Sequence, residues 1–134
     1  MAEFPASHKD LLEKQRVASL ATVGPTGYPQ VTAVAFLLDD DGMLKCSLNT
    51  TRQKTKNLMA NPKCTMFFLD LANPGRTLEV RADAELIPDD DFSFCAKAGA
   101  RFNADFRTND KPGETRVQVV FHPTRINTWG AAAS

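Results

Sequence analysis

The chain has 134 residues, of which 16 are basic and 16 are acidic, so its formal net charge at pH 7 is zero. A single domain of this length can bury a core without disulfides or structural metals. The charge balance argues against general binding to nucleic acid or to an anionic membrane, because both need a large basic surface, and any anion site must therefore be local.

Cysteine usage points to the cellular compartment. Cys46, Cys64 and Cys95 lie far apart in apolar segments and form no CxxC pair, which predicts reduced, buried thiols in a cytosolic protein. The N-terminal segment lacks a cationic start followed by an apolar run, and no apolar segment approaches the roughly 20 residues that span a bilayer. We therefore expect a cytoplasmic protein without a membrane segment.

A short helix and a hairpin begin the chain. Ser7 and Asp10 have the spacing of a capping box, and two leucines follow, so a helix is predicted that ends near residue 15. Apolar and β-branched residues predict strands over 17–23 and 29–38, with GPTG as the turn between them.

A third strand, 43–48, is followed by a change of period. In the strand, alternation should point Leu44 inward and Lys45 outward. A helix then begins at Thr50 or Thr51 and ends before Pro62, since the residue before proline avoids helical dihedrals. The predicted buried face of this helix consists of Thr51, Thr55, Leu58 and Met59.

The second half of the chain contains two long strands, a helix and a final strand. We predict strands over 63–70 and 77–87, a helix over 89–98 that buries Phe92, Cys95 and Ala96, and a last strand over 115–130 that bends at Pro123. About six strands and three short helices result, and the helices interrupt a mostly antiparallel set. The predicted fold is therefore mainly β, an antiparallel sheet curled into a closed or split barrel that leaves few exposed edges.

The stretch TRQKTKN at the start of the second helix is the candidate anion site. Free backbone N–H groups and the helix dipole attract a negative group there, and Arg52 and Lys54 flank the buried face of the helix. Hydroxyls from Ser47, Thr50 and Thr51 lie near the same point. The alternative is an ordinary solvated surface with Thr50 as a simple cap, although cations at a helix start oppose its dipole.

The order of these segments resembles the flavin-binding split barrels related to pyridoxamine 5′-phosphate oxidase. The resemblance covers residues 8–87 and, more loosely, the final strand. Within it, the pattern S-x-x-x-x-R-x-K-T-K-N, from Ser47 to Asn57, is most similar to the branch that uses the deazaflavin coenzyme F-420. One departure is Ala82, which stands where many relatives carry a glycine, and the chain lacks the basic C-terminal signature of the vitamin-oxidising members.

The resemblance implies a homodimer with two cofactor sites at the subunit interface. It assigns the cofactor phosphate to Arg52 and Lys54 with Ser47, Thr50, Thr51 and Asn57, and the cofactor ring to the second strand at Val31, Thr32, Ala33 and Val34. Trp129 either caps the barrel or stacks on the cofactor or substrate. No side chain needs to act as a general acid, so no catalytic residue is assigned.

Three functions follow as hypotheses from this resemblance. The first is an oxidoreductase in which reduced coenzyme F-420 passes hydride to a small unsaturated or conjugated acceptor. The second keeps the fold and uses FMN, as a flavin reductase or oxidase-like protein, and the third is a non-catalytic protein that stores a flavin or deazaflavin. His8 and His122 lack partners at metal-ligand spacing, so we expect both at the surface or at a strand end, and no metal.

Overall fold

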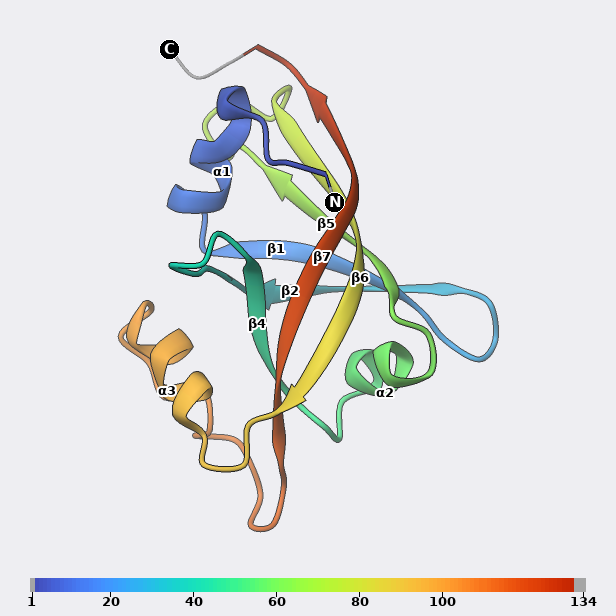
Figure 1. Ribbon diagram of the computed structural model, residues 1–134, viewed down its shortest axis with the longest axis vertical. Helices are drawn as coiled ribbons and strands as arrows, with labels where there is room; N and C mark the ends of the chain where they lie inside the picture. The colour runs from blue at the N-terminus through green and yellow to red at the C-terminus, as the bar shows by residue number, and fades with distance from the viewer. Residues whose placement is uncertain (1, 132–134) are drawn as a thin grey trace.

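The computed structural model describes residues 2–131 and forms one curled antiparallel sheet of seven strands with three short helices around it (Figure 1). The strands follow the spatial order β2-β1-β5-β6-β7-β4-β3. Their bounds are β1 (Val17–Val23), β2 (Pro29–Ala35), β3 (Leu37–Leu38), β4 (Leu44–Asn49), β5 (Lys63–Leu69), β6 (Thr77–Pro88) and β7 (Arg116–Trp129). The helices are α1 (Lys9–Lys14), α2 (Gln53–Ala60) and α3 (Ser93–Ala100). The predicted fold class, an antiparallel split β-barrel, is confirmed.

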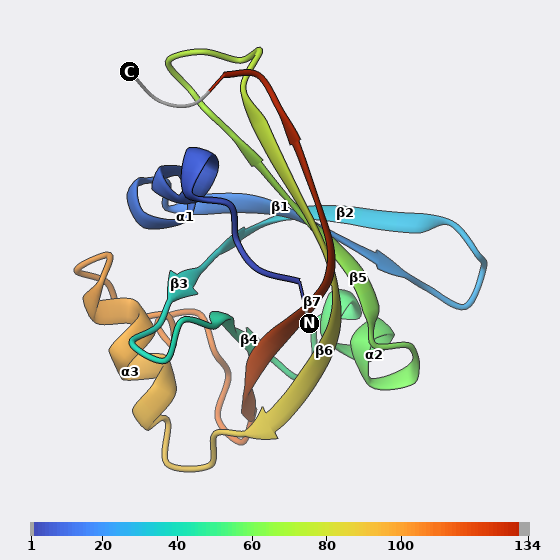
Figure 2. The ribbon, with the colours of Figure 1, turned by 45° about the horizontal axis from the view of Figure 1, so that its top comes forward.

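The sheet curls because its two edge strands are consecutive in sequence. β2 and β3 stand at opposite ends of the strand order, yet only Phe36 separates them. The Phe36 ring is buried against Phe68 at a centroid distance of 4.9 Å, and its backbone N–H donates to the Arg16 carbonyl. The prediction of one continuous strand over 29–38 is therefore wrong at Phe36, where the chain passes from one edge of the sheet to the other. Figure 2 shows β1 and β2 running across the direction of β6 and β7.

The core fills the inside of this curl, and strand alternation predicts most of it. On β5 and β6, alternate residues from Cys64 to Phe68 and from Leu78 to Ala82 are buried as expected. β4 is the exception, since Lys45, predicted to point outward, is also buried and binds Asp39 and Asp41 at 2.8 Å each. Because α3 packs against β4, both faces of this strand are covered.

The capping box predicted at the first helix does not form. Ser7 belongs to a short 3-10 helix, η1 (Ala6–His8), and its hydroxyl pairs with the His8 ring instead of a backbone N–H. Asp10 binds Arg76, which is buried. His8, expected at the surface, is only 2 % exposed, and its Nε2 lies 3.1 Å from the Trp129 carbonyl oxygen. Distant partners, Arg76 and Trp129, thus hold Asp10 and His8, while Ser7 pairs with its neighbour.

The other two helices begin later than predicted. α2 starts at Gln53, and Met59, predicted to be buried, is 56 % exposed, whereas Asn57 is buried. α3 starts at Ser93, because the Asp89 carboxylate accepts the N–H groups of Phe94 and Cys95 at 3.1 and 2.9 Å. Of the predicted buried face of α3, only Cys95 is correct; Phe92 precedes the helix and Ala96 is exposed.

The final strand bends where expected. The pairing of β6 with β7 shifts register between Arg81 and Ala82, opposite Pro123, so the position that departs from the glycine of many relatives lies at an irregularity of the ladder. The three cysteines are free and buried, in agreement with the prediction of packed thiols. Among residues 2–131, no helix is long and apolar enough to cross a membrane.

Candidate functional site

A cavity of about 220 Å³ lies where the free edge of β2, the end of β4 and the start of α2 meet. Five of the predicted site residues line it: Ala33, Val34, Ser47, Arg52 and Lys54. Five further residues complete the wall: Ala35, Leu48, Asn49, Phe106 and Arg116. The fold thus brings the predicted phosphate-binding cations and part of the predicted ring-binding strand to one place.

The turn between β4 and α2 sets the direction of the two cations. The Asn49 side-chain oxygen accepts the N–H of Thr51 at 2.9 Å and its hydroxyl at 2.8 Å, an Asx-type turn. The buried Thr55 hydroxyl donates to the Asn49 carbonyl at 2.8 Å and ties the first turn of α2 to β4. Arg52 then stands at the N-cap position, with no side chain capping the helix. The helix start is therefore held rigidly while its end stays open to a ligand.

Arg52 and Lys54 are cations without an anionic partner in the described chain. Neither forms an ion pair or a side-chain hydrogen bond within residues 2–131, whereas Lys45, Arg76 and Arg116 all bind carboxylates. Burial, followed by the neighbouring charge of Arg52, lowers the pKa of Lys54. An anion in the cavity would relieve both effects, because it replaces lost hydration and offsets the repulsion between the two cations.

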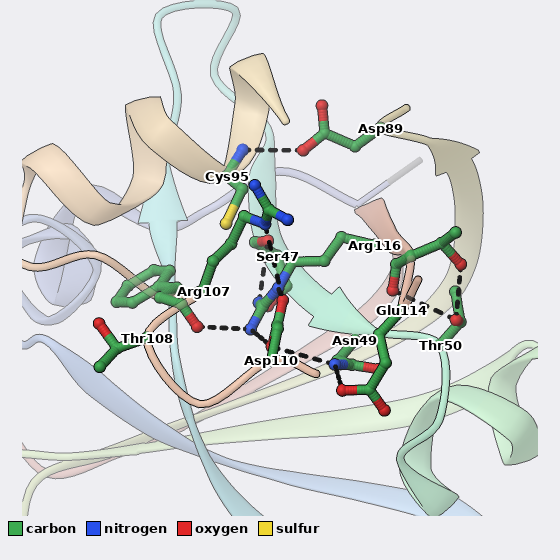
Figure 3. Close-up of polar contacts among 12 residues, drawn as sticks. Ser47, Asn49, Thr50, Asp89, Cys95, Arg107, Thr108, Asp110, Glu114 and Arg116 are labelled. Atoms are coloured by element: carbon green, nitrogen blue, oxygen red, sulfur yellow. Dashed lines mark hydrogen bonds and ion pairs between the residues drawn. The ribbon is translucent and has the colours of Figure 1, made fainter. Parts of the chain in front are cut away.

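The third cation of the cavity, Arg116, is neutralised. Figure 3 shows its guanidinium against Asp110, with Nε 2.9 Å from Oδ2 and Nη2 3.0 Å from Oδ1. Hydrogen bonds from Arg116 hold the pKa of Asp110 down at about 2, against the cost of burial. Arg116 also donates to the carbonyl oxygen and, at 3.3 Å, to the hydroxyl oxygen of Ser47, which lines the cavity. Arg116 thus contributes donors at this wall but little net charge.

The remaining predicted site residues lie outside the cavity wall of this protomer. Thr50 pairs with the Thr115 hydroxyl at 2.8 Å, and Thr51 binds Asn49. Asn57 donates to Thr22 at 3.0 Å and to Gln30 at 3.3 Å, so it joins α2 to the β1–β2 hairpin. Their role toward a cofactor stays a prediction.

Two other predicted residues, Val31 and Trp129, are exposed. Val31 is 62 % exposed on β2, and Trp129 is 73 % exposed at the end of β7, where it pairs with Thr77. Trp129 therefore does not fill the barrel of its own chain. A contact of either side chain with a cofactor stays a prediction.

One polar atom next to the cavity has no partner in the described chain. Thr32 stands on β2 beside the cavity residue Ala33, and its buried Oγ1 forms no hydrogen bond within residues 2–131. A buried hydroxyl without a partner is costly, so a ligand with polar edge atoms along β2 would satisfy it. This orphaned atom and the two unneutralised cations both fit a ligand that carries a polar ring and a phosphate.

Sequence reasoning missed five wall residues: Ala35, Leu48, Asn49, Phe106 and Arg116. Asn49 had a local signal, because Asn before two threonines at a strand end is typical of an Asx turn. Phe106 and Arg116 had none. Phe106 lies in a loop whose path depends on tertiary contacts, and Arg116 reaches the cavity through the long-range pairing of β7 with β4.

Comparisons with known proteins agree with this geometry. The family model for pyridoxamine 5′-phosphate oxidase matches residues 4–130. A solved structure named "F420 Reductase" is 36 % identical, with a TM-score of 0.79, and the match covers 92 % of this chain and 98 % of that one. No curated protein matches the chain significantly.

More distant structures share the fold alone. A conserved hypothetical protein from Mycobacterium tuberculosis is 22 % identical with a TM-score of 0.75, and the match covers 96 % of this chain and 86 % of that one. HutZ, a heme storage protein from Vibrio cholerae, is 16 % identical with a TM-score of 0.70, and the match covers 98 % of both chains. With a family match over nearly the whole chain and a curled split-barrel sheet, this protein belongs to the pyridoxamine 5′-phosphate oxidase family.

Proposed function

We propose that the protein is an oxidoreductase that uses reduced coenzyme F-420 to transfer hydride to a small unsaturated or conjugated acceptor. The observation that carries the proposal is the cavity at the start of α2, where Arg52 and Lys54 lack anionic partners among residues 2–131 and stand beside a wall of small β2 residues. The 36 % identity to the protein named "F420 Reductase" supports the choice of cofactor.

The residues present fit such a group in two parts. Arg52 and Lys54, with the Ser47 hydroxyl and the backbone N–H groups at the start of α2, would hold the phosphate. Thr32 and Val34, on the same face of β2, would lie along the ring, and the Thr32 hydroxyl would gain the partner that it lacks within residues 2–131. The bound deazaflavin supplies the hydride. The protein's part is to orient the ring and exclude water, since hydride transfer depends on donor and acceptor carbons about 3–3.5 Å apart.

We further propose that the protein works as a homodimer with its cofactor sites at the interface. The outer face of β1, β2 and β5 exposes apolar side chains, among them Val17, Val31 and Phe67. Ser19 pairs with Ala33 on one side and Phe67 on the other, so this face continues directly from the cavity. A second copy covering it would bury the apolar side chains and close the open side of the cavity.

The phosphate anchor alone does not distinguish coenzyme F-420 from FMN, because both carry an anionic group and a planar ring. Fluorescence titration of the purified protein with each cofactor makes the distinction. Tighter binding of F-420 is expected, and tighter binding of FMN would replace the deazaflavin by FMN in this proposal.

Turnover separates an enzyme from a storage protein. Reduced cofactor incubated with enones, quinones or bilins should be oxidised faster with the protein than without it. Tight binding without oxidation above background would favour storage of the cofactor. Size-exclusion chromatography with light scattering tests the dimer, and a monomer at micromolar concentration would contradict it.

A further inference from the structure

The segment between α3 and β7, residues 101–115, reaches the cavity through Phe106. Arg116 holds this residue in place, because its Nη2 donates to the Phe106 carbonyl oxygen at 2.7 Å. The Phe106 ring rests on Phe102 of the same segment at a centroid distance of 5.6 Å. Phe106 is partly exposed, so core packing does not fix its position and the contact with Arg116 matters.

Asp110 determines where the Arg116 guanidinium lies. The pair is bidentate, and the side chains of Arg116 and Asp110 are only 9 % and 3 % exposed. In a buried pair of this geometry each partner depends on the other, since either charge left alone would be strongly disfavoured. Asp110 also cancels the charge of Arg116, so Arg52 and Lys54 remain the unneutralised cations of the cavity wall.

Asn49 connects this pair to the phosphate-binding end of the cavity. Its side-chain amide donates to Asp110 at 3.0 Å and to Glu114 at 3.3 Å (Figure 3). Its side-chain oxygen forms the Thr51 turn that leads to Arg52. Asn49 is 3 % exposed, so one buried side chain is shared by the segment that carries Phe106 and the segment that carries the two cations.

We propose that Asp110 is a positioning residue: by holding Arg116 and Asn49 it fixes residues 101–115 so that Phe106 forms the apolar wall against which the acceptor lies. The inference rests on the proposed function and deepens it, because it assigns one wall of the acceptor site. Phe106 stands in the same cavity as Ala33, Ala35 and Leu48, and all four are uncharged. This wall suits a flat, apolar, conjugated acceptor, whereas the cationic end suits the phosphate.

The test compares Asp110→Asn with Asp105→Asn. Asparagine at 110 keeps an oxygen of the same shape for Asn49 but loses the charge that holds Arg116. Asp105 lies in the same segment and is exposed. Among the described residues, its side chain accepts only the backbone N–H of Arg107, which asparagine can also do. Both variants receive the same chemical change, and one of them leaves the Arg116 cluster intact.

Trypsin cleavage after the exposed Arg107 reports the order of the segment without any ligand. We expect Asp110→Asn to be cut about tenfold faster than Asp105→Asn, because local opening exposes the bond. In turnover assays with reduced F-420, the KM for an enone acceptor should rise about tenfold in Asp110→Asn while the cofactor Kd does not rise. A lower Kd agrees with the inference, because Arg116 then adds an unneutralised charge beside the phosphate.

Three results would overturn the inference. One is equal cleavage of the two variants, and another is an acceptor KM that Asp110→Asn leaves unchanged. The third is a parallel loss of cofactor and acceptor binding, which would make Asp110 a general structural residue. If Asp110→Asn does not fold, Phe106→Ala decides: the acceptor KM should rise about tenfold at constant cofactor Kd, and an unchanged KM refutes the wall. Failure of F-420 to bind the unaltered protein would instead refute the proposed function, while the trypsin comparison still tests Asp110.

Discussion

Replacing Lys54 with methionine should weaken cofactor binding while leaving the unliganded protein at least as stable as before. Lys54 lines the cavity, and no carboxylate within residues 2–131 pairs with it. In the unliganded protein its charge is therefore a cost, and only a bound anion turns it into a gain. Methionine keeps an apolar stem of similar length and removes only the charge.

The loss of affinity can be bounded from the contact that is removed. A hydrogen bond to a charged group contributes about 1.5–3 kcal/mol, and each 1.4 kcal/mol corresponds to about a tenfold change in Kd. Because Arg52 remains beside the phosphate and solvent screens the open side of the cavity, the lower end applies. We expect the Kd for F-420 to rise about tenfold or somewhat more.

The effect on stability has the opposite sign. Burial and then the charge of Arg52 lower the pKa of Lys54, so the folded protein holds this proton less tightly than the unfolded chain does. At neutral pH the charge of Lys54 therefore lowers the free energy of unfolding by its full amount. This destabilisation disappears only as pH rises from the lowered pKa toward the ordinary value of 10.5. Removing the charge should keep or raise the melting temperature of the unliganded protein at pH 7.

The assay pairs a fluorescence titration with thermal unfolding of the same samples. Lys56→Met is the matched control, since Lys56 lies on the same helix, is exposed and does not line the cavity. The control should change neither quantity appreciably. An unchanged Kd in Lys54→Met, or a melting temperature well below that of the control, would refute the anion site at the start of α2.

Three further predictions concern stability. The folded-state pKa of Asp110 is about 2 against an ordinary 3.8, so its contribution to stability is complete above the ordinary value and is lost as pH falls through about 2. Asp110→Asn should therefore weaken the loss of unfolding free energy at acid pH, measured by denaturant titration at a series of pH values. An unaltered dependence on pH would contradict the pairing. Phe68→Ala should lower the free energy of unfolding in urea by about 3–5 kcal/mol, since removal of the fully buried ring leaves a cavity. A loss below about 1 kcal/mol would show that the core repacks to fill this cavity. Gly99→Ala should lower the free energy of unfolding by about 1–3 kcal/mol, because the added Cβ would collide with the Ala104 carbonyl. Gly75→Ala is the control: its Cβ would make only an ordinary contact, so thermal unfolding should change little.

Much of the fold and the cationic end of the site could be read from local patterns. Period-2 alternation predicted β5 and β6, turn residues predicted the β1–β2 hairpin, and the cations of α2 were recognised from their place at a helix start. These features depend on neighbours within a few residues, so sequence alone determines them. The resemblance carried by the order of segments over residues 8–87 then pointed to the family that the later comparison confirmed.

Other features depend on partners that sequence does not bring together. The predicted strand is interrupted at Phe36 because the curled sheet brings its two edges to that residue. Lys45 is buried because α3 covers β4, and Met59 is exposed because packing turns the Asn57 side of α2 inward. Phe106 reaches the cavity through the Arg116–Asp110 pair, which no local pattern marks. Sequence determined which residues can form strands, turns and a cationic helix start, whereas tertiary structure decided which side chains meet, because long-range burial and charge pairing outweigh local preference.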